Sequence, residues 1–336
     1  MPDFGAFVIS LDFELHWGVR DTCPPHGPYR KNLLGSRMVI PQILDLFAKS
    51  GIAATWATVG FLFASSRAEL EAFSPQLRPC YRKLALDPYR EPVGETEEVD
   101  TLHFAPSIVR ALQRTPRQEI GTHTFSHYYC TEPGQDKAAF EADLESAIRI
   151  ARLFGVRPES IVFPRNQVNR AYRDVLLRKG ILSYRGNQKS WIYRFSERRD
   201  RRWIRAARLL DAHVPITGTN LHAWKHVVEA DNLCNVPASL FLRPCIPGFR
   251  AMDALRLRRI SECLKQAAQS KRIFHLWWHP HNFGAYPEAN LEFLRRIVAV
   301  YRHWQARMGL RSMNMSEVAA LARQEAGICV ACPTSP

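Results

Sequence analysis

The stretch that decides the fold is AFVISLDFE, residues 6–14. Its apolar and aromatic residues predict a buried strand over residues 6–13. The strand ends in two carboxylates, Asp12 and Glu14. Residues two apart in an extended backbone point the same way, so both carboxylates face one side. Two like charges this close repel, so the pattern favours a neighbouring cation or arginine. The alternative interpretation is a strand that simply ends in polar residues.

Strand and helix patterns alternate along the rest of the chain. Further strands are expected over residues 52–58, 118–122, 160–163, 181–184 and 273–278. Helices are expected over residues 36–50, 136–154, 169–179, 251–269, 288–308 and 316–323. Ser36 is the expected N-cap of the first helix and Gly51 its stop. This alternation predicts parallel β/α units and an α/β fold.

Two stretches, residues 65–116 and 187–247, interrupt the alternation with many prolines and charges. We interpret them as insertions over one end of a barrel. Residues 1–326 are then expected to form a single domain, with residues 327–336 as a flexible tail.

Composition narrows the class of protein. The 336 residues include 46 Lys and Arg against 32 Asp and Glu, a net charge of +14, and 46% hydrophobic residues. These values exclude a mainly disordered chain, a collagen-like repeat and a disulfide miniprotein. Acidic residues interrupt the start of the chain where a secretory signal would be apolar, and eight cysteines then favour reduced thiols in the cytoplasm. No nucleic-acid motif accompanies the basic charge, so no nucleic-acid partner is expected.

The segment GTHTFSH, residues 121–127, follows the strand predicted over residues 118–122. On a helical turn, His123 and His127 would present both imidazoles from one face. With Glu14 they would form the two-histidine, one-carboxylate set of hydrolytic zinc, with a position left open for water. His222 and His226 share the spacing but lie in the second insertion, where packing or surface exposure explains them. The prediction is a divalent metal ion, zinc first, on Glu14, His123 and His127.

Two further strand ends carry candidate catalytic residues. Arg165 follows the strand at residues 160–163 and could pair with Asp12 or bind substrate. In IFHLWWHPH, residues 273–281, alternation places His275 and His279 on one face. His279 lies at the carboxyl end of this strand, where barrel enzymes carry their chemistry, and could act as a general acid near neutral pH.

These motifs resemble those of the metal-dependent polysaccharide deacetylases with a NodB-homology domain, carbohydrate esterase family 4. The resemblance is carried by the acid-x-acid strand end at Asp12, by the His-Thr-x-x-His motif at His123–His127 and by the strand ending at His279. It implies a distorted (β/α) barrel with inserted segments over one end. It also implies Asp12 as general base, His279 as general acid, and Glu14, His123 and His127 as metal ligands.

The chain departs from the family pattern around Arg165. The sequence FPRN at residues 163–166 stands where the family usually has an Arg-Pro-Pro-Tyr-like motif. Arg165 is retained as a catalytic candidate.

The expected activity is hydrolysis of the N-acetyl group of an amino sugar, in a glycan or a glycan precursor. A deformylase, another amidase of the family, or a non-catalytic barrel that binds a glycan or a partner stay open. Seven arginines between Arg194 and Arg208 predict a basic amphipathic helix. A helix of this kind could bind a phosphate-bearing or lipid-linked substrate and contact the inner face of a membrane. The alternative is that it is simply a solvated helix on the inserted segment.

Overall fold

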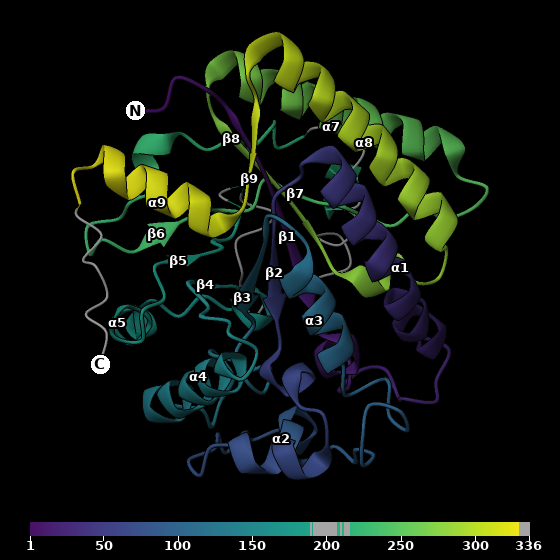
Figure 1. Ribbon diagram of the computed structural model, residues 1–336, viewed down its shortest axis with the longest axis vertical. Coiled ribbons are helices and arrows are strands. Elements are labelled where there is room, and N and C mark those ends of the chain that lie inside the picture. The colour runs from purple at the N-terminus through teal and green to yellow at the C-terminus, as the bar shows by residue number, and fades with distance from the viewer. Residues whose placement is uncertain (189, 191–206, 209, 212–215, 329–336) are drawn as a thin grey trace.

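The computed structural model describes residues 1–188, 190, 207–208, 210–211 and 216–328. Within these ranges the strands form one parallel sheet in the order β6-β5-β4-β3-β2-β1-β8-β7, with β9 paired to β1 (Figure 1). The strands are β1 Ala6–Phe13, β2 Ala54–Thr58, β3 Gln118–Thr122, β4 Ser160–Ile161, β5 Ser183–Tyr184, β6 Cys234–Asn235, β7 Leu240–Phe241, β8 Ile273–Trp278 and β9 Arg311–Met313.

The two edges of this sheet come together. The edge strands β6 and β7 are consecutive in the chain, and residues 236–239 join them. In this connection the Ala238 N–H donates to the Gly186 carbonyl beyond β5 at 2.9 Å, and the Ser239 N–H donates to the His275 carbonyl in β8 at 2.8 Å. The connection therefore spans from one side of the sheet to the other, which confirms the predicted distorted barrel.

The helices lie on the outside of the sheet (Figure 1). They are α1 Arg30–Ser50, α2 Arg67–Phe73, α3 Pro106–Arg114, α4 Lys137–Arg152, α5 Arg173–Arg178, α7 Arg250–Ser270, α8 Pro287–Met308 and α9 Met315–Glu325. Ser36 is not the N-cap that the sequence predicts: α1 begins six residues earlier, and Ser36 is buried inside it. Gly51 does end α1, in the left-handed region with φ 65°.

The central strand β1 is buried along its whole length and separates two environments. Phe7, Ile9 and Leu11 belong to the largest apolar cluster, which they share with α1 and α8. Because side chains alternate along a strand, Ser10 and Asp12 face the other way, toward the barrel interior. There they meet the side chain of Arg185. The alternation along β1 thus places apolar side chains against the helices and the Asp12 carboxylate in the barrel interior.

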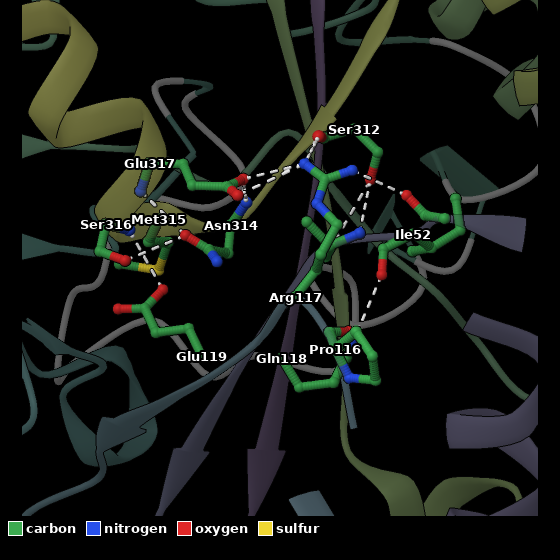
Figure 2. Close-up of polar contacts among 12 residues, drawn as sticks. Ile52, Pro116, Arg117, Gln118, Glu119, Ser312, Asn314, Met315, Ser316 and Glu317 are labelled. Atoms are coloured by element: carbon green, nitrogen blue, oxygen red, sulfur yellow. Dashed lines mark hydrogen bonds and ion pairs between the residues drawn. The ribbon is translucent and has the colours of Figure 1, made fainter. Parts of the chain in front are cut away.

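Polar side chains join α9 to the amino ends of β2 and β3 (Figure 2). Arg117 donates to the Ser312 carbonyl at 2.8 Å and to the Glu317 carboxylate at 3.3 Å. Glu119 accepts from the Ser316 N–H at 3.1 Å. These contacts attach α9 to the amino ends of the strands, whereas barrel enzymes carry their active sites at the opposite, carboxyl ends.

Both stretches that the sequence marks as insertions contain regular elements. The first holds α2 and α3, and α3 packs against β3 and α1. The second contributes β6 and β7. Most of the arginine-rich helix predicted between Arg194 and Arg208 lies outside the described residues, as do residues 329–336 of the predicted tail. None of the helices in the described ranges is both long and apolar enough to cross a membrane.

Candidate active site

Two strand ends bring Glu14, His123 and His127 together. Glu14 follows β1, and both histidines follow β3. The Glu14 Oε2 lies 3.3 Å from the His123 Nε2 and 3.1 Å from the His127 Nε2. All three residues are buried, with 4%, 1% and 3% of their surfaces exposed. Their candidate ligand atoms all lie within 4.8 Å of one another, close enough for one metal ion.

The segment that carries both histidines is not the helical turn that the sequence predicts. Thr124 and His127 adopt the left-handed region, with φ 63° and 59°, so the chain turns sharply between the two histidines. A carboxylate from α4 holds this loop: Asp143 accepts from the Phe125 N–H at 2.7 Å and from the Ser126 N–H at 3.2 Å. Burial raises the pKa of Asp143 to about 7, although these hydrogen bonds oppose the rise.

Sequence reasoning missed this role of Asp143. The sequence feature that could have indicated it is an aspartate at a core position of the helix predicted over residues 136–154, among Phe140, Leu144 and Ala147. A charged residue at a core position needs a partner, and here the partner is the loop backbone.

The protonation states of the cluster suit a metal ion. His123 Nδ1 donates to the Val162 carbonyl at 2.7 Å, so its Nε2 carries the lone pair that faces Glu14. Burial lowers the pKa of His127 to about 4, which keeps this imidazole neutral. Burial would raise the pKa of Glu14, but His279, His123 and His127 hold it well below its usual range. Neutral imidazoles and an ionised carboxylate are the donor forms that bind metal.

Gly18 makes room for the Glu14 carboxylate. A Cβ built at Gly18 would lie 2.0 Å from the Cδ and 2.0 Å from the Oε1 of Glu14. Gly18 ends the short 3₁₀ helix Leu15–Gly18 that follows Glu14, so the close approach is fixed by the local chain path. A side chain at this position would displace the carboxylate.

Arg185 pairs with Asp12 in place of the predicted Arg165. Arg185 Nη1 and Nη2 each lie 2.7 Å from one oxygen of Asp12, and Nη1 also donates to the Ser10 hydroxyl at 3.0 Å. Burial would raise the pKa of Asp12, but Arg185, His123 and His279 outweigh it and lower the pKa.

Arg165 faces away from Asp12. Its backbone is left-handed, with φ 54°, and its guanidinium pairs with Asp21 and lies over the Tyr129 ring at 4.4 Å from the centroid. Both Arg165 and Arg185 follow strands, so either arginine could be predicted from the sequence as the partner of Asp12. The choice between them depends on the backbone at Arg165.

His279 lies beside both acidic residues. Its Nε2 is 3.6 Å from Asp12 Oδ2 and 3.6 Å from Glu14 Oε1, and 24% of its side chain is exposed. Its Nδ1 lies 3.3 Å from Asn282 Oδ1, so Asn282 is the group that orients this ring. The neighbouring His281 ring stacks on His279 with centroids 5.0 Å apart.

Two other histidines singled out in the sequence lie apart from this cluster. His275 is buried below it, with Nε2 2.8 Å from the Ser10 hydroxyl and Nδ1 3.0 Å from the Val236 carbonyl. His222 is also buried, and its Nε2 lies 3.3 Å from the Ala238 carbonyl. Both serve the packing of the barrel.

A pocket opens next to His279. Two aromatic side chains form part of its wall, Trp277 and Phe241, whose ring centroids lie 4.7 Å apart. Arginines form another part. The lining residues are Arg165, Asn166, Asn187, Gln188, Arg208, Ala238, Phe241, Arg243, Trp277 and His279. The pocket therefore offers apolar ring faces and positive charge directly beside the cluster.

Comparison with known proteins finds one family whose model matches part of the chain. Residues 23–183 match the family model of the polysaccharide deacetylases, a span that includes His123 and His127. No curated protein matches the sequence.

Several solved structures share the fold. A protein assigned as a polysaccharide deacetylase from Mycobacterium smegmatis is 15% identical with a TM-score of 0.61, over 100% of this chain and 96% of that one. Another from Pseudomonas aeruginosa PAO1 is 12% identical with a TM-score of 0.54, over 95% and 90%. The allantoinase Puue is 12% identical with a TM-score of 0.53, over 98% and 94%.

At these identities the structural likeness shows the distorted barrel, and the family model matches a little under half of the chain. Residues 23–183 are therefore similar to the polysaccharide deacetylases, and the chain is a hydrolase of the type that acts on amide C–N bonds.

Proposed function

We propose that this protein is a metal-dependent hydrolase that removes the N-acetyl group from an amino sugar in a glycan or glycan precursor. The observation that carries the proposal is the buried Glu14 carboxylate, which lies 3.1 and 3.3 Å from two imidazole Nε2 atoms. His279 connects this cluster to the pocket, since its Nε2 lies 3.6 Å from Glu14 Oε1 and its side chain lines the pocket.

Glu14, His123 and His127 would hold one divalent ion. Two imidazoles and one carboxylate are a donor set that zinc prefers, and three protein ligands leave a position for water. Such an ion, when bound, lowers the pKa of a water molecule and polarises a carbonyl group.

Asp12 and His279 would carry the protons. Asp12 is ionised and held in place by Arg185, so it would take a proton from the attacking water. His279 donates from Nδ1 to Asn282 and presents Nε2 to the site, so its doubly protonated form would give the Nε2 proton to the nitrogen of the leaving amine and become a neutral imidazole. The C–N bond then breaks, and acetate and the free amine are released.

The pocket supports an anionic amino sugar as substrate. Trp277 and Phe241 offer apolar faces for a sugar ring, and Arg165, Arg208 and Arg243 bring positive charge to the same walls. Guanidinium groups bind phosphates well. We therefore propose a phosphate-bearing sugar, nucleotide-linked or lipid-linked, handled in the cytoplasm or at the inner face of the membrane. Arg165 would bind this substrate rather than orient Asp12.

The test is acid release from N-acylated amino sugars by the zinc-loaded protein. Acetate release that falls by about 10²–10⁴-fold in Asp12→Asn, with zinc still bound, supports the proposal. Formate release from N-formyl sugars instead would identify the deformylase alternative. No release of either acid would favour a non-catalytic barrel.

The substrate proposal has its own test. Arg243→Gln should raise KM more for a phosphate-bearing sugar than for its neutral counterpart, because only the former loses a charge contact. Equal effects on both substrates would contradict an anionic substrate.

A further inference from the structure

A second cluster of potential metal ligands lies outside the candidate active site. His16 belongs to the 3₁₀ helix after β1, whereas Glu91 and His103 belong to the inserted stretch between β2 and β3. His16 Nδ1 lies 2.8 Å from His103 Nε2, and Glu91 Oε1 lies 3.5 and 3.8 Å from these two atoms. The side chains are 0%, 4% and 14% exposed for His16, His103 and Glu91.

The outer nitrogen of each ring is already a hydrogen-bond donor. His16 Nε2 lies 2.9 Å from the Cys23 carbonyl, which can only accept, so the proton is on Nε2. His103 Nδ1 lies 2.7 Å from Asp100 Oδ2. The Asp100 carboxylate also accepts two backbone N–H bonds, at 2.8 and 3.2 Å, which favours its ionised, accepting form. His103 therefore donates from Nδ1.

The inner nitrogens then face each other with lone pairs. A neutral imidazole has one donor and one acceptor, and both rings have used their donor on the outer side. Two lone pairs 2.8 Å apart repel unless a cation lies between or beside them. The charges near the two rings favour a cation, because two carboxylates, Glu91 and Asp100, stand against one guanidinium, that of Arg20. Arg20 itself donates to the carbonyls of Ala85 and Asp87 at 2.8 and 3.2 Å.

We infer that His16 Nδ1, His103 Nε2 and Glu91 Oε1 bind a second divalent cation of the zinc class. Ligand atoms of a tetrahedral zinc site lie about 3.3 Å apart, given bonds of about 2.0–2.1 Å. The observed separations of 2.8, 3.5 and 3.8 Å scatter around this value. Asp100 on the outer nitrogen of His103 is the partner that metal-bound histidines usually have.

The consequence of this site is structural. The segment that follows Glu14 is attached to the inserted stretch here: the His16 N–H lies 3.3 Å from the Leu102 carbonyl, and the Trp17 indole N–H donates to the His103 carbonyl at 2.9 Å. A cation shared by His16 and His103 would fix these two segments to each other. It would thereby hold the backbone that presents Glu14.

The experiment distinguishes this site from the active site by using His127→Ala, which removes one of the proposed ligands of the active-site metal. Zinc per chain is measured by mass spectrometry after loading and desalting. Wild-type protein should hold two ions and His127→Ala one; adding Glu91→Gln to His127→Ala should leave none. The control Glu95→Gln removes an exposed carboxylate of the same stretch and should change nothing.

Cobalt(II) gives an independent readout that does not depend on activity. The His127→Ala protein should show a visible absorption band with cobalt that His103→Gln abolishes, and zinc should raise its Tm. A single ion in wild-type protein, or zinc binding to His127→Ala that Glu91→Gln leaves unchanged, would overturn the inference and leave a shared proton as the cation.

Discussion

Arg185 binds both carboxylate oxygens of Asp12, each at 2.7 Å, at the centre of the barrel. The planar guanidinium matches a carboxylate with two parallel hydrogen bonds, and its other face lies over Trp277 at 4.1 Å from the ring centroid. Both side chains are buried, so each neutralises a charge that water cannot reach. The pair therefore fixes the position and the ionised state of Asp12 together.

Arg185→Met should shift the acid limb of the pH profile of kcat/KM to higher pH. Without Arg185, burial dominates and the pKa of Asp12 rises, so more of it is protonated at mildly acidic pH. Loss of stability of about 3–5 kcal/mol is also expected, because a buried charge is left unpaired. Arg178→Met, which removes an arginine that pairs with Glu141 and Asp174 on the surface of α5, is the control. An acid limb that stays in place would contradict the role of Asp12.

Asp143→Asn should weaken zinc binding although Asp143 is not a proposed ligand. The amide would place a donor against one of the donors of Phe125 or Ser126, at a cost of about 1–3 kcal/mol, and the loop between the two histidines would relax. Zinc titration and urea unfolding measure both effects. Asp136→Asn is the control: Asp136 caps the same helix, and asparagine caps equally well. Unchanged zinc affinity in Asp143→Asn would refute the positioning role.

Gly18→Ala should lower zinc occupancy with little loss of secondary structure. The added Cβ would overlap the Glu14 carboxyl group, which must move away from the histidines. Metal content and circular dichroism test this. Gly27→Ala is the control, since its nearest obstacle, the Pro24 carbonyl oxygen, lies 3.1 Å from the added carbon. Full occupancy in Gly18→Ala would show that the carboxylate can adjust freely.

His275 should make the metal-free protein less stable as the pH falls. Burial, followed by the charge of Arg185, lowers its pKa from 6.5 to about 3. The unfolded chain thus binds this proton first, and the stabilisation present above about pH 6.5 is lost as the pH falls toward 3. Between pH 7 and pH 5 the loss from this residue should be about 2 kcal/mol.

Urea unfolding at the two pH values measures the effect. His275→Gln should remove that part of the pH dependence, whereas the control His303→Gln, on the exposed face of α8, should retain it. A His275→Gln protein with the wild-type pH dependence would contradict the buried neutral state of His275.

Three strands could be predicted from the sequence to the residue, including the short one at residues 118–122. The predicted strands at residues 6–13, 118–122 and 273–278 are confirmed by β1, β3 and β8. The short strands β6, β7 and β9 were missed because two or three residues carry no period of their own. The equally short β4 and β5 were predicted because they lie within longer runs, residues 160–163 and 181–184. The pairing of β6 and β7 depends on neighbours far along the chain, which a local pattern does not contain.

The histidine loop shows why local spacing was insufficient. The spacing of His123 and His127 predicted that they meet, and they do, with ring centroids 5.0 Å apart. The backbone that achieves it is left-handed at two positions and held by Asp143, which lies in the next helix. The candidate metal ligands could therefore be read from the sequence, whereas the backbone conformation of their loop depends on a tertiary contact with Asp143.

The central claim is that Glu14, His123 and His127 hold a metal ion that removal of an N-acetyl group requires. The most direct measurement is acetate release from N-acetylated amino sugars by one protein sample, first stripped with chelator and then titrated with zinc. We predict no turnover in the stripped protein, restoration on addition of zinc, and no restoration in His123→Ala. Equal acetate release before and after stripping, or full activity in zinc-loaded His123→Ala, would contradict the account.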